Sequence, residues 1–209
     1  LSQARFLALQ SQINPHFLFN TLNSINRTVM LGRREQALTM LDSLSVLLRY
    51  NLADAQMPAL LGEELGITEE YLKIQKMRFS SRLNVDVRHD RKLEQAVTLP
   101  RFTLQPLVEN AVIHGLEPKE EGGTLILDVR KTGNYIRIRI CDNGMGIEKE
   151  RLERIRRRLS EKQPERIGVW NIWQRLSLYT GRDDSLKIMS KKGAGTIVSI
   201  YLHRGEEDV

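Results

Sequence analysis

The spacing of apolar residues changes near residue 83, and this change divides the chain into two parts. Between residues 35 and 52 leucines recur three or four positions apart, which is typical of one buried helical face. The residues expected on that face are Leu38, Leu41, Leu44, Leu48 and Leu52. From Leu83 onward apolar and polar residues alternate, as in a half-buried strand. The sequence therefore predicts a helical domain over residues 1–78 and an α+β domain over residues 79–209.

The helical domain is expected to be a hairpin that needs a partner. Gly32, followed by two arginines, marks a break between two helices, and Pro58 punctuates the chain again further on. The first helix carries its own apolar stripe, with Leu18, Leu22, Ile25 and Val29. Helices with one long apolar stripe and little else rarely bury themselves alone. We therefore expect a dimer in which two hairpins complete a four-helix bundle.

The second domain is expected to combine short strands with helices. Strands are predicted over residues 83–87, 124–130, 135–141, 185–190 and 196–203, and helices over residues 104–114 and 169–179 and from residue 148. Because strands joined mainly by hairpins pair antiparallel, this pattern predicts a two-layer α+β sandwich.

Composition narrows the classes of function. The net charge of +6 suits either a nucleic-acid binder or a protein that handles polyanionic nucleotides. The dense basic run at residues 151–158 contains no aromatic residue, so we expect no direct nucleic-acid partner. The apolar runs are far shorter than the ~18 residues that cross a bilayer. The chain starts at Leu1 and lacks a signal-peptide pattern, so we expect a cut fragment.

A proline and a histidine stand together in the first helical segment. Pro15 inside a helical pattern removes a hydrogen bond, at a cost of ~3 kcal/mol or more. His16 lies roughly 200° around the helix from Leu18, at ~100° per residue, and so faces away from the apolar stripe. An outward-facing imidazole is largely neutral at pH 7 and available as a nucleophile. The alternative is an incidental helix histidine beside a kink.

Polar residues interrupt the helix predicted over residues 104–114. Glu109, Asn110 and His114 break its apolar pattern, and the last two are one helical turn apart. The carbonyl oxygen of an asparagine suits a Mg²⁺ ion that already shares phosphate oxygens. A solvent-facing polar stripe explains the same pattern.

Two glycine-rich segments follow strands or begin helices. In the first, Asp142 precedes Gly144 and Gly146, which lets the backbone approach a flat ligand while the carboxylate accepts a hydrogen bond, for example from an adenine amine. In the second, Gly168 lies at a predicted helix start, where free N–H groups favour phosphate. A tight turn and an ordinary helix entry are the respective alternatives.

In order and spacing, these segments resemble the sensor histidine kinases of the LytS/YesM type, whose ATP-binding domain has the GHKL (Bergerat) fold. The segment LQSQINPHFLFNTLNSI resembles the phosphoacceptor region of that family, and LLRYNL and EEYLKIQKMRF resemble later parts of its helical region. The segments LQPLVENAVIHG, DNGMG, IGVWNIWQRL and GAGT resemble its N box, its two glycine boxes and its closing glycine motif.

The resemblance implies a role for each matching position. It makes His16 the phosphorylated histidine, Asn110 the Mg²⁺ ligand and Asp142 the residue that reads adenine. The other residues implied around ATP are His114, Gly144, Gly146, Arg166, Gly168, Gly193, Gly195 and Thr196. The sequence departs from many relatives at Phe17, where they carry an acidic base after the histidine, so Glu109 is a tentative base. It also departs at Ile113, where many N boxes carry lysine, and at Arg166, which replaces the usual first glycine of the second box.

The implied function is that of the cytoplasmic catalytic portion of a membrane sensor kinase. ATP with Mg²⁺ would phosphorylate a histidine, and the phosphoryl group would pass to an aspartate of a response regulator. A homodimer and a sensor region outside this sequence belong to the same expectation. The alternatives are a GHKL-type ATPase and a nucleotide-sensing dimer without histidine phosphorylation.

Overall fold

A computed structural model describes residues 15–52, 57–162 and 168–203 of the chain. These residues divide into two compact units. Residues 1–54 and 66–80 belong to the first unit, and residues 55–65 and 81–209 belong to the second. Helix α4 (Leu61–Phe79) therefore contributes its first turn to the second unit and its remainder to the first.

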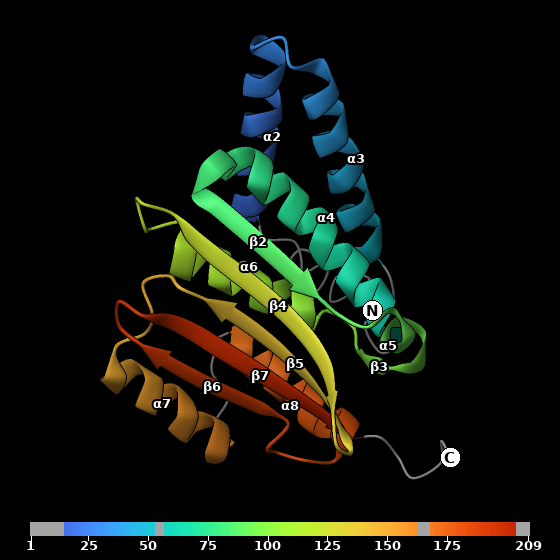
Figure 1. The fold of residues 1–209 in the computed structure, drawn as a ribbon, viewed down its shortest axis with the longest axis vertical. Helices are drawn as coiled ribbons and strands as arrows, with labels where there is room; N and C mark the ends of the chain where they lie inside the picture. Colours follow the sequence, from blue (N-terminus) through green and yellow to red (C-terminus); the bar gives the residue numbers. More distant parts are fainter. Residues whose placement is uncertain (1–14, 53–56, 163–167, 204–209) are drawn as a thin grey trace, which may run out of the picture. The chain divides into compact units, whose positions relative to one another are not determined.

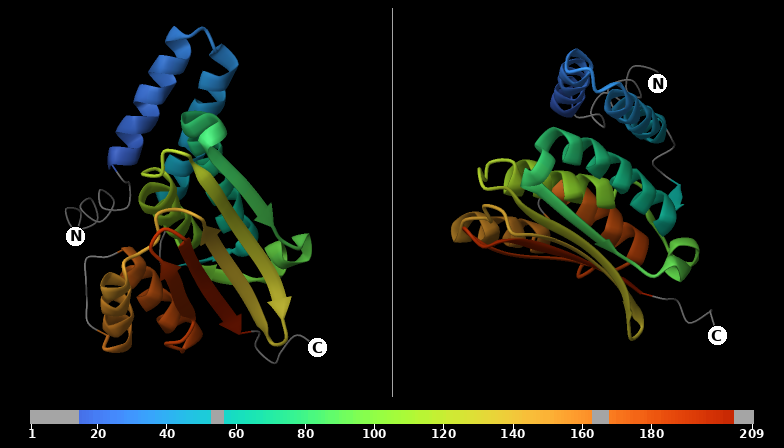
Figure 2. Two further views of the ribbon diagram at one scale, coloured as in Figure 1. Left: turned by 60° about the vertical axis from the view of Figure 1, so that its left-hand side comes forward. Right: turned by 45° about the horizontal axis from the view of Figure 1, so that its top comes forward.

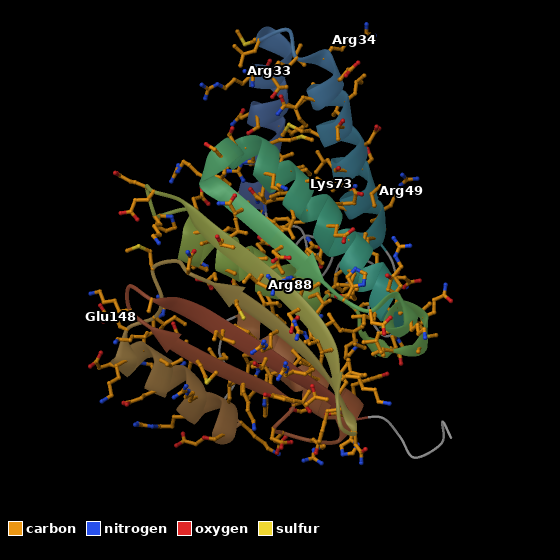
Figure 3. All side chains as sticks on the ribbon, in the orientation of Figure 1. Arg33, Arg34, Arg49, Lys73, Arg88 and Glu148 are labelled. Atoms are coloured by element: carbon orange, nitrogen blue, oxygen red, sulfur yellow. The ribbon has the colours of Figure 1, made fainter. Side chains whose placement is uncertain are left out.

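The first unit is helical, as predicted. Helix α2 (Pro15–Met30) and helix α3 (Arg34–Asn51) form a hairpin, and Gly32 in the turn between them has φ +73°. Figure 3 labels Arg33 and Arg34 at this turn. Since few residues other than glycine adopt a positive φ readily, Gly32 accounts for the break where the sequence placed it.

The buried face of the hairpin differs from the predicted one. Helix α3 buries Ala37, Met40, Leu44 and Leu47, whereas the expected core residues Leu38, Leu41 and Leu52 are 50%, 41% and 69% exposed. In α2 only Ile25 of the predicted stripe is fully buried, and Leu22 and Val29 are exposed. The leucine face predicted over residues 35–52 is therefore only partly buried within one chain, and its burial in the expected dimer stays a prediction.

Contacts with α4 explain which face is buried. The ring of Phe17 on α2 lies 5.2 Å from that of Tyr71 on α4, and the Ser43 hydroxyl on α3 donates to Glu70 at 2.6 Å. The faces of α2 and α3 that contact α4 therefore include an aromatic and a polar residue. A count of leucines does not detect such a face.

The second unit is built on a five-stranded sheet with the strand order β2-β4-β5-β7-β6. Its strands are β2 (Leu83–Arg88), β4 (Gly123–Thr132), β5 (Tyr135–Asp142), β6 (Leu186–Lys191) and β7 (Gly195–His203). Only the β2–β4 pair is parallel, which confirms the prediction of mostly antiparallel strands. A separate antiparallel pair, β1 (Pro58–Leu60) with β3 (Thr98–Pro100), was not predicted.

Helices cover one face of this sheet (Figures 1 and 2). They are α6 (Leu104–Asn110), its π-helical continuation (Ala111–Leu116) and α8 (Gly168–Thr180), while α7 (Lys149–Ser160) packs beside β6. Alternation along β5 buries Ile136, Ile138 and Ile140, each at most 2% exposed. The two-layer α+β sandwich is therefore confirmed.

The remaining short elements were missed by the sequence analysis. They are α5 (Arg91–Ala96) and the 3₁₀ turn (Ser80–Arg82), in addition to β1 and β3. Elements of three to six residues are too short to establish a hydrophobic period, so periodicity does not predict them.

Within the ranges that the structure describes, no helix combines the length and apolar character that crossing a bilayer requires.

Candidate functional site

A cavity of about 350 Å³ lies within the second unit, and six of the predicted site residues line it. Of those residues, its lining includes Asn110, His114, Asp142, Gly146, Gly168 and Thr196. They come from α6 and its π-helical continuation, from the end of β5, from the start of α8 and from β7. Apolar side chains such as Leu107 and Ile140 complete the wall, so the cavity suits a flat, largely apolar ring with a few polar groups.

Asp142 stands at the end of β5 and is only 8% exposed. Its Oδ1 accepts a hydrogen bond from the backbone N–H of Gly144 at 2.9 Å. Burial raises the pKa of this carboxyl above the ordinary aspartate value, although the N–H groups of Gly144 and Thr196 act in the opposite direction. A buried acceptor at the rim of an apolar cavity is suited to reading an amino group on a ring.

Three glycines allow the chain to pack around Asp142. A Cβ atom on Gly115 would lie 2.8 Å from Oδ1 of Asp142, and one on Gly144 would lie 2.2 Å from the carbonyl oxygen of Gly115. At Gly195, where φ is +103°, a Cβ would lie 1.9 Å from the carbonyl oxygen of Asp142. Gly144 and Gly195 do not line the cavity, but they make close backbone contacts with Gly115 and Asp142, which do.

Gly115 was missing from the predicted site residues, although it lines the cavity. The available signal was a glycine at the end of the N box, next to His114. A glycine is needed at position 115 because the backbone there lies close to Asp142. Asp142 is 27 positions further along the chain, so the sequence alone does not reveal this contact. Gly193, by contrast, was predicted; it is not among the lining residues, and its N–H donates to the carbonyl of Met145 at 2.7 Å.

Asn110 lies close to the beginning of α8. A Cβ atom on Gly168, the first residue of that helix, would be 3.9 Å from Nδ2 of Asn110. The first N–H groups of a helix have no partner within it and favour anions. The cavity thus places a neutral amide beside a helix start that suits phosphate oxygens.

The helix that carries Asn110 becomes π-helical directly after it. The N–H of Glu117 donates to the carbonyl of Val112 at 2.8 Å, which closes the wider turn. Single π-helical turns occur frequently at functional sites. His114, exposed on this turn, lines the cavity together with Asn110, as their predicted spacing on one face requires.

Helix α7 contributes one cation to the cavity and uses another elsewhere. Arg151 lines the cavity, although it was not among the residues predicted for the site. The guanidinium of Arg156 donates two hydrogen bonds, of 3.1 and 2.6 Å, to the carbonyl of Ile188 on the edge strand β6. Leu152 is buried, so α7 is anchored to the sheet by both apolar and polar contacts. Arg166 lies outside the described residues.

The donor set of the cavity can be tested for a metal ion. Among the described residues there is no group of three or more His, Cys, Asp or Glu side chains that could hold one. Mg²⁺ commonly takes one or two protein oxygens and completes its shell with phosphate oxygens and water. The side-chain oxygen of Asn110 fits that arrangement, whereas a metal centre built from protein ligands alone does not.

The two remaining predicted residues lie outside the cavity. His16 is exposed on α2, and the amide nitrogen of Asn20 lies 3.1 Å from its Nε2. Glu109 is half-buried next to Asn110 but is not a lining residue. The role of His16 as acceptor and that of Glu109 as base therefore stay predictions.

Comparison with known proteins gives two family matches. The model of the family "Histidine kinase-, DNA gyrase B-, and HSP90-like ATPase" matches residues 96–206, and that of the family "Histidine kinase" matches residues 4–83. The chain is 35% identical over 202 residues to the sensor histidine kinase YesM of Bacillus subtilis, covering 97% of this chain and 34% of the relative. It is 34% identical over 204 residues to the sensor histidine kinase YpdA of Escherichia coli, covering 96% and 34%.

Solved structures show the same fold. The blue-light activated histidine kinase of Erythrobacter litoralis gives a TM-score of 0.51 at 17% identity, covering 92% of this chain and 59% of that one. The catalytic domain of histidine kinase ThkA gives 0.51 at 14% identity, covering 70% and 96%. The chain spans about a third of the length of the curated relatives it matches.

Proposed function

The chain belongs to the family of histidine kinase-, DNA gyrase B- and HSP90-like ATPases, among the histidine kinases of the LytS/YesM type, and from this premise we propose that it is the catalytic part of a two-component sensor histidine kinase. It binds ATP in the cavity of the second unit and transfers the γ-phosphoryl group to His16. The observation that carries this proposal is the meeting of Asp142, Asn110 and the first turn of α8 in one cavity.

Asp142 and the apolar wall account for the binding of adenine. The carboxylate accepts a hydrogen bond from the exocyclic amine, while side chains such as Leu107 and Ile140 contact the ring. One oxygen of Asp142 is already bound by the N–H of Gly144. The carboxylate is therefore fixed in direction before the nucleotide arrives, which lowers the entropy lost on binding.

Asn110 and the start of α8 account for the binding of the phosphates. The side-chain oxygen of Asn110 would hold Mg²⁺, and the ion would supply positive charge that neutralises the phosphates. The first N–H groups of α8, at Gly168 and beyond, bind further phosphate oxygens. Arg151 on α7, which lines the same cavity, supplies a positive charge.

The phosphoryl group is transferred to a ring nitrogen of His16. The lone pair of that nitrogen forms the new N–P bond, while the bond between γ-phosphorus and the bridging oxygen breaks and ADP leaves with the electron pair. The proton on the other ring nitrogen passes to a base, for which Glu109 is the tentative candidate. Because exposure leaves the imidazole accessible, His16 suits both this step and the onward transfer to an aspartate of a response regulator.

A homodimer is part of the proposal. Large apolar side chains remain exposed on the hairpin, among them Phe19, Met30, Leu31, Leu38 and Leu52. Several large exposed apolar side chains on one hairpin support an interface with a second chain. Attachment to a membrane would come through a sensor region outside this sequence.

The test is labelling of the chain with γ-³²P-ATP and Mg²⁺. We expect a label that is lost in acid and stable in base, as a phosphohistidine is. The variant His16→Gln should lose the label while binding ATP as before, and the control His203→Gln, exposed at the end of β7, should keep it. Label on His16→Gln would refute the acceptor, and ATP hydrolysis without any label would favour the ATPase alternative.

A further inference from the structure

The short loop that leads into α6 has an unusual backbone. Phe102 has φ +60°, a conformation that side-chain-bearing residues seldom adopt. Thr103 precedes the first residue of α6, but its hydroxyl does not cap the helix; it donates to the carbonyl of Pro100 at 2.6 Å instead. The N–H groups at this helix start must therefore find an acceptor elsewhere.

Glu64 in the first turns of α4 supplies that acceptor. Its Oε1 accepts from the N–H of Phe102 at 2.7 Å, and its Oε2 accepts from those of Thr103 and Leu104 at 2.9 and 2.8 Å. The side chain is 1% exposed. A carboxylate that is fully removed from water and binds three consecutive N–H groups holds the loop in one position, because moving it would leave buried charge and donors unpaired.

The same loop is tied to the other helix of the cavity. The guanidinium of Arg175 on α8 donates to the carbonyl of Phe102 at 2.6 Å. Residue 102 is thus held through its N–H by α4 and through its carbonyl by α8. Since α6 carries Asn110 and α8 begins at Gly168, both polar sides of the cavity are fixed relative to this one residue.

We propose that Glu64 is a positioning residue for the nucleotide site, which sets α6 so that Asn110 faces the metal-bound phosphates. This inference rests on the proposed function, because it assumes that ATP and Mg²⁺ occupy the cavity. Glu64 belongs to the second unit, while α4 continues from Gly66 into the helical unit. A displacement of α4 would therefore reach Asn110 through the carboxylate of Glu64, and nucleotide binding would oppose that displacement in turn.

The variant Glu64→Gln tests the proposal with little change in shape. The amide keeps one acceptor oxygen but replaces the other, so that at least one of the three N–H groups loses its partner. We expect the affinity for a non-hydrolysable ATP analogue with Mg²⁺ to fall about tenfold, since hydrogen bonds to a charged group are the strong ones. The matched control is Glu63→Gln, which removes the neighbouring exposed carboxylate that pairs with Arg101 at 3.1 Å; its affinity should change less than about twofold.

A positioning role is separated from general destabilisation by its dependence on Asn110. Affinities are measured by calorimetry well below the melting temperature, with Mg²⁺ or with EDTA, in the wild type and in Asn110→Ala. If Glu64 acts through Asn110, the loss caused by Glu64→Gln should shrink in EDTA and in the Asn110→Ala background. An equal loss in all four conditions overturns the proposal.

The remaining outcomes are distinct. If the wild type binds no nucleotide, the proposed function itself fails; if it binds and Glu64→Gln binds equally well, only the role of Glu64 fails. Should Glu64→Gln not fold, Arg175→Gln carries the same expectation, because it removes the contact of α8 with the same peptide. A loss of affinity in Arg175→Gln that does not depend on Mg²⁺ overturns the proposal.

Discussion

Replacing Gly115 by alanine should weaken ATP binding through Asp142 while leaving the fold intact. The new methyl carbon would lie 2.8 Å from Oδ1 and 3.1 Å from Cγ of Asp142. To restore ordinary van der Waals separation the carboxylate must retreat by about half an ångström or more. Oδ1 is held by the N–H of Gly144 at 2.9 Å, so the hydrogen bonds to Gly144 and to the adenine amine cannot both be kept. A hydrogen bond to a charged group contributes about 1.5–3 kcal/mol, so we expect the ATP affinity to fall by about tenfold to hundredfold.

The same substitution should change stability only slightly. Alanine gains about 1 kcal/mol over glycine in a helix, which offsets part of an overpacking cost of about 1–3 kcal/mol. Gly66 provides the matched control, because it lies in α4 and a Cβ there meets no atom within 4 Å. Calorimetric titration of Gly115→Ala and Gly66→Ala, with melting curves of both, separates the effects. Unchanged affinity in Gly115→Ala would show that Asp142 does not contact the nucleotide as argued.

Four further predictions concern the cavity and the hairpin. Asp142→Asn should bind ATP at least about tenfold more weakly in a titration, because an amide replaces the charged acceptor; unchanged affinity would remove Asp142 from the site. The raised pKa of Asp142 means that its ionisation opposes folding: the stability linked to this group is present at low pH and lost as the pH rises through the raised pKa, so Asp142→Asn should melt higher than wild type at pH 7. ATP affinity should instead decline as the pH falls through the same pKa, and a decline of equal size in Asp142→Asn would assign it to another group. Leu38→Glu with Leu41→Glu should yield a folded monomer by light scattering, since both side chains are about half exposed in the single chain; an unchanged dimer would place the interface elsewhere.

Long elements with a clear period were predictable from the sequence. Alternation along β5 and the apolar spacing in α8 each extend over several residues, and their bounds agree with the predicted ranges to within one or two residues. The three-residue strands β1 and β3 could not be predicted, because their pairing joins segments about 40 positions apart. A local pattern does not contain that information.

The candidate site was predictable where function requires a particular residue type within a short segment. Asp142, Asn110 and Gly168 were each selected from their own segment, and all three line one cavity. Gly115 and Glu64 were not selected, because their importance arises from contacts with residues distant in sequence, namely Asp142 and residues 102–104. Sequence motifs predicted the residues proposed to contact the nucleotide. The residues that position them could be identified only from the three-dimensional structure.

The partial exposure of the predicted leucine face has a physical explanation within the proposed dimer. A hydrophobic period reflects every surface that is removed from water in the working protein, including surfaces buried by a second copy. In α3 the buried residues include Ala37, Met40 and Leu44, whereas Leu38 and Leu41 are about half exposed in the single chain. Leaving such large side chains in water forgoes roughly 25 cal/mol for each Å² of apolar area that an interface would cover. The leucine pattern in α3 therefore supports the proposed dimer, in which a second chain would cover the side chains that one chain leaves exposed.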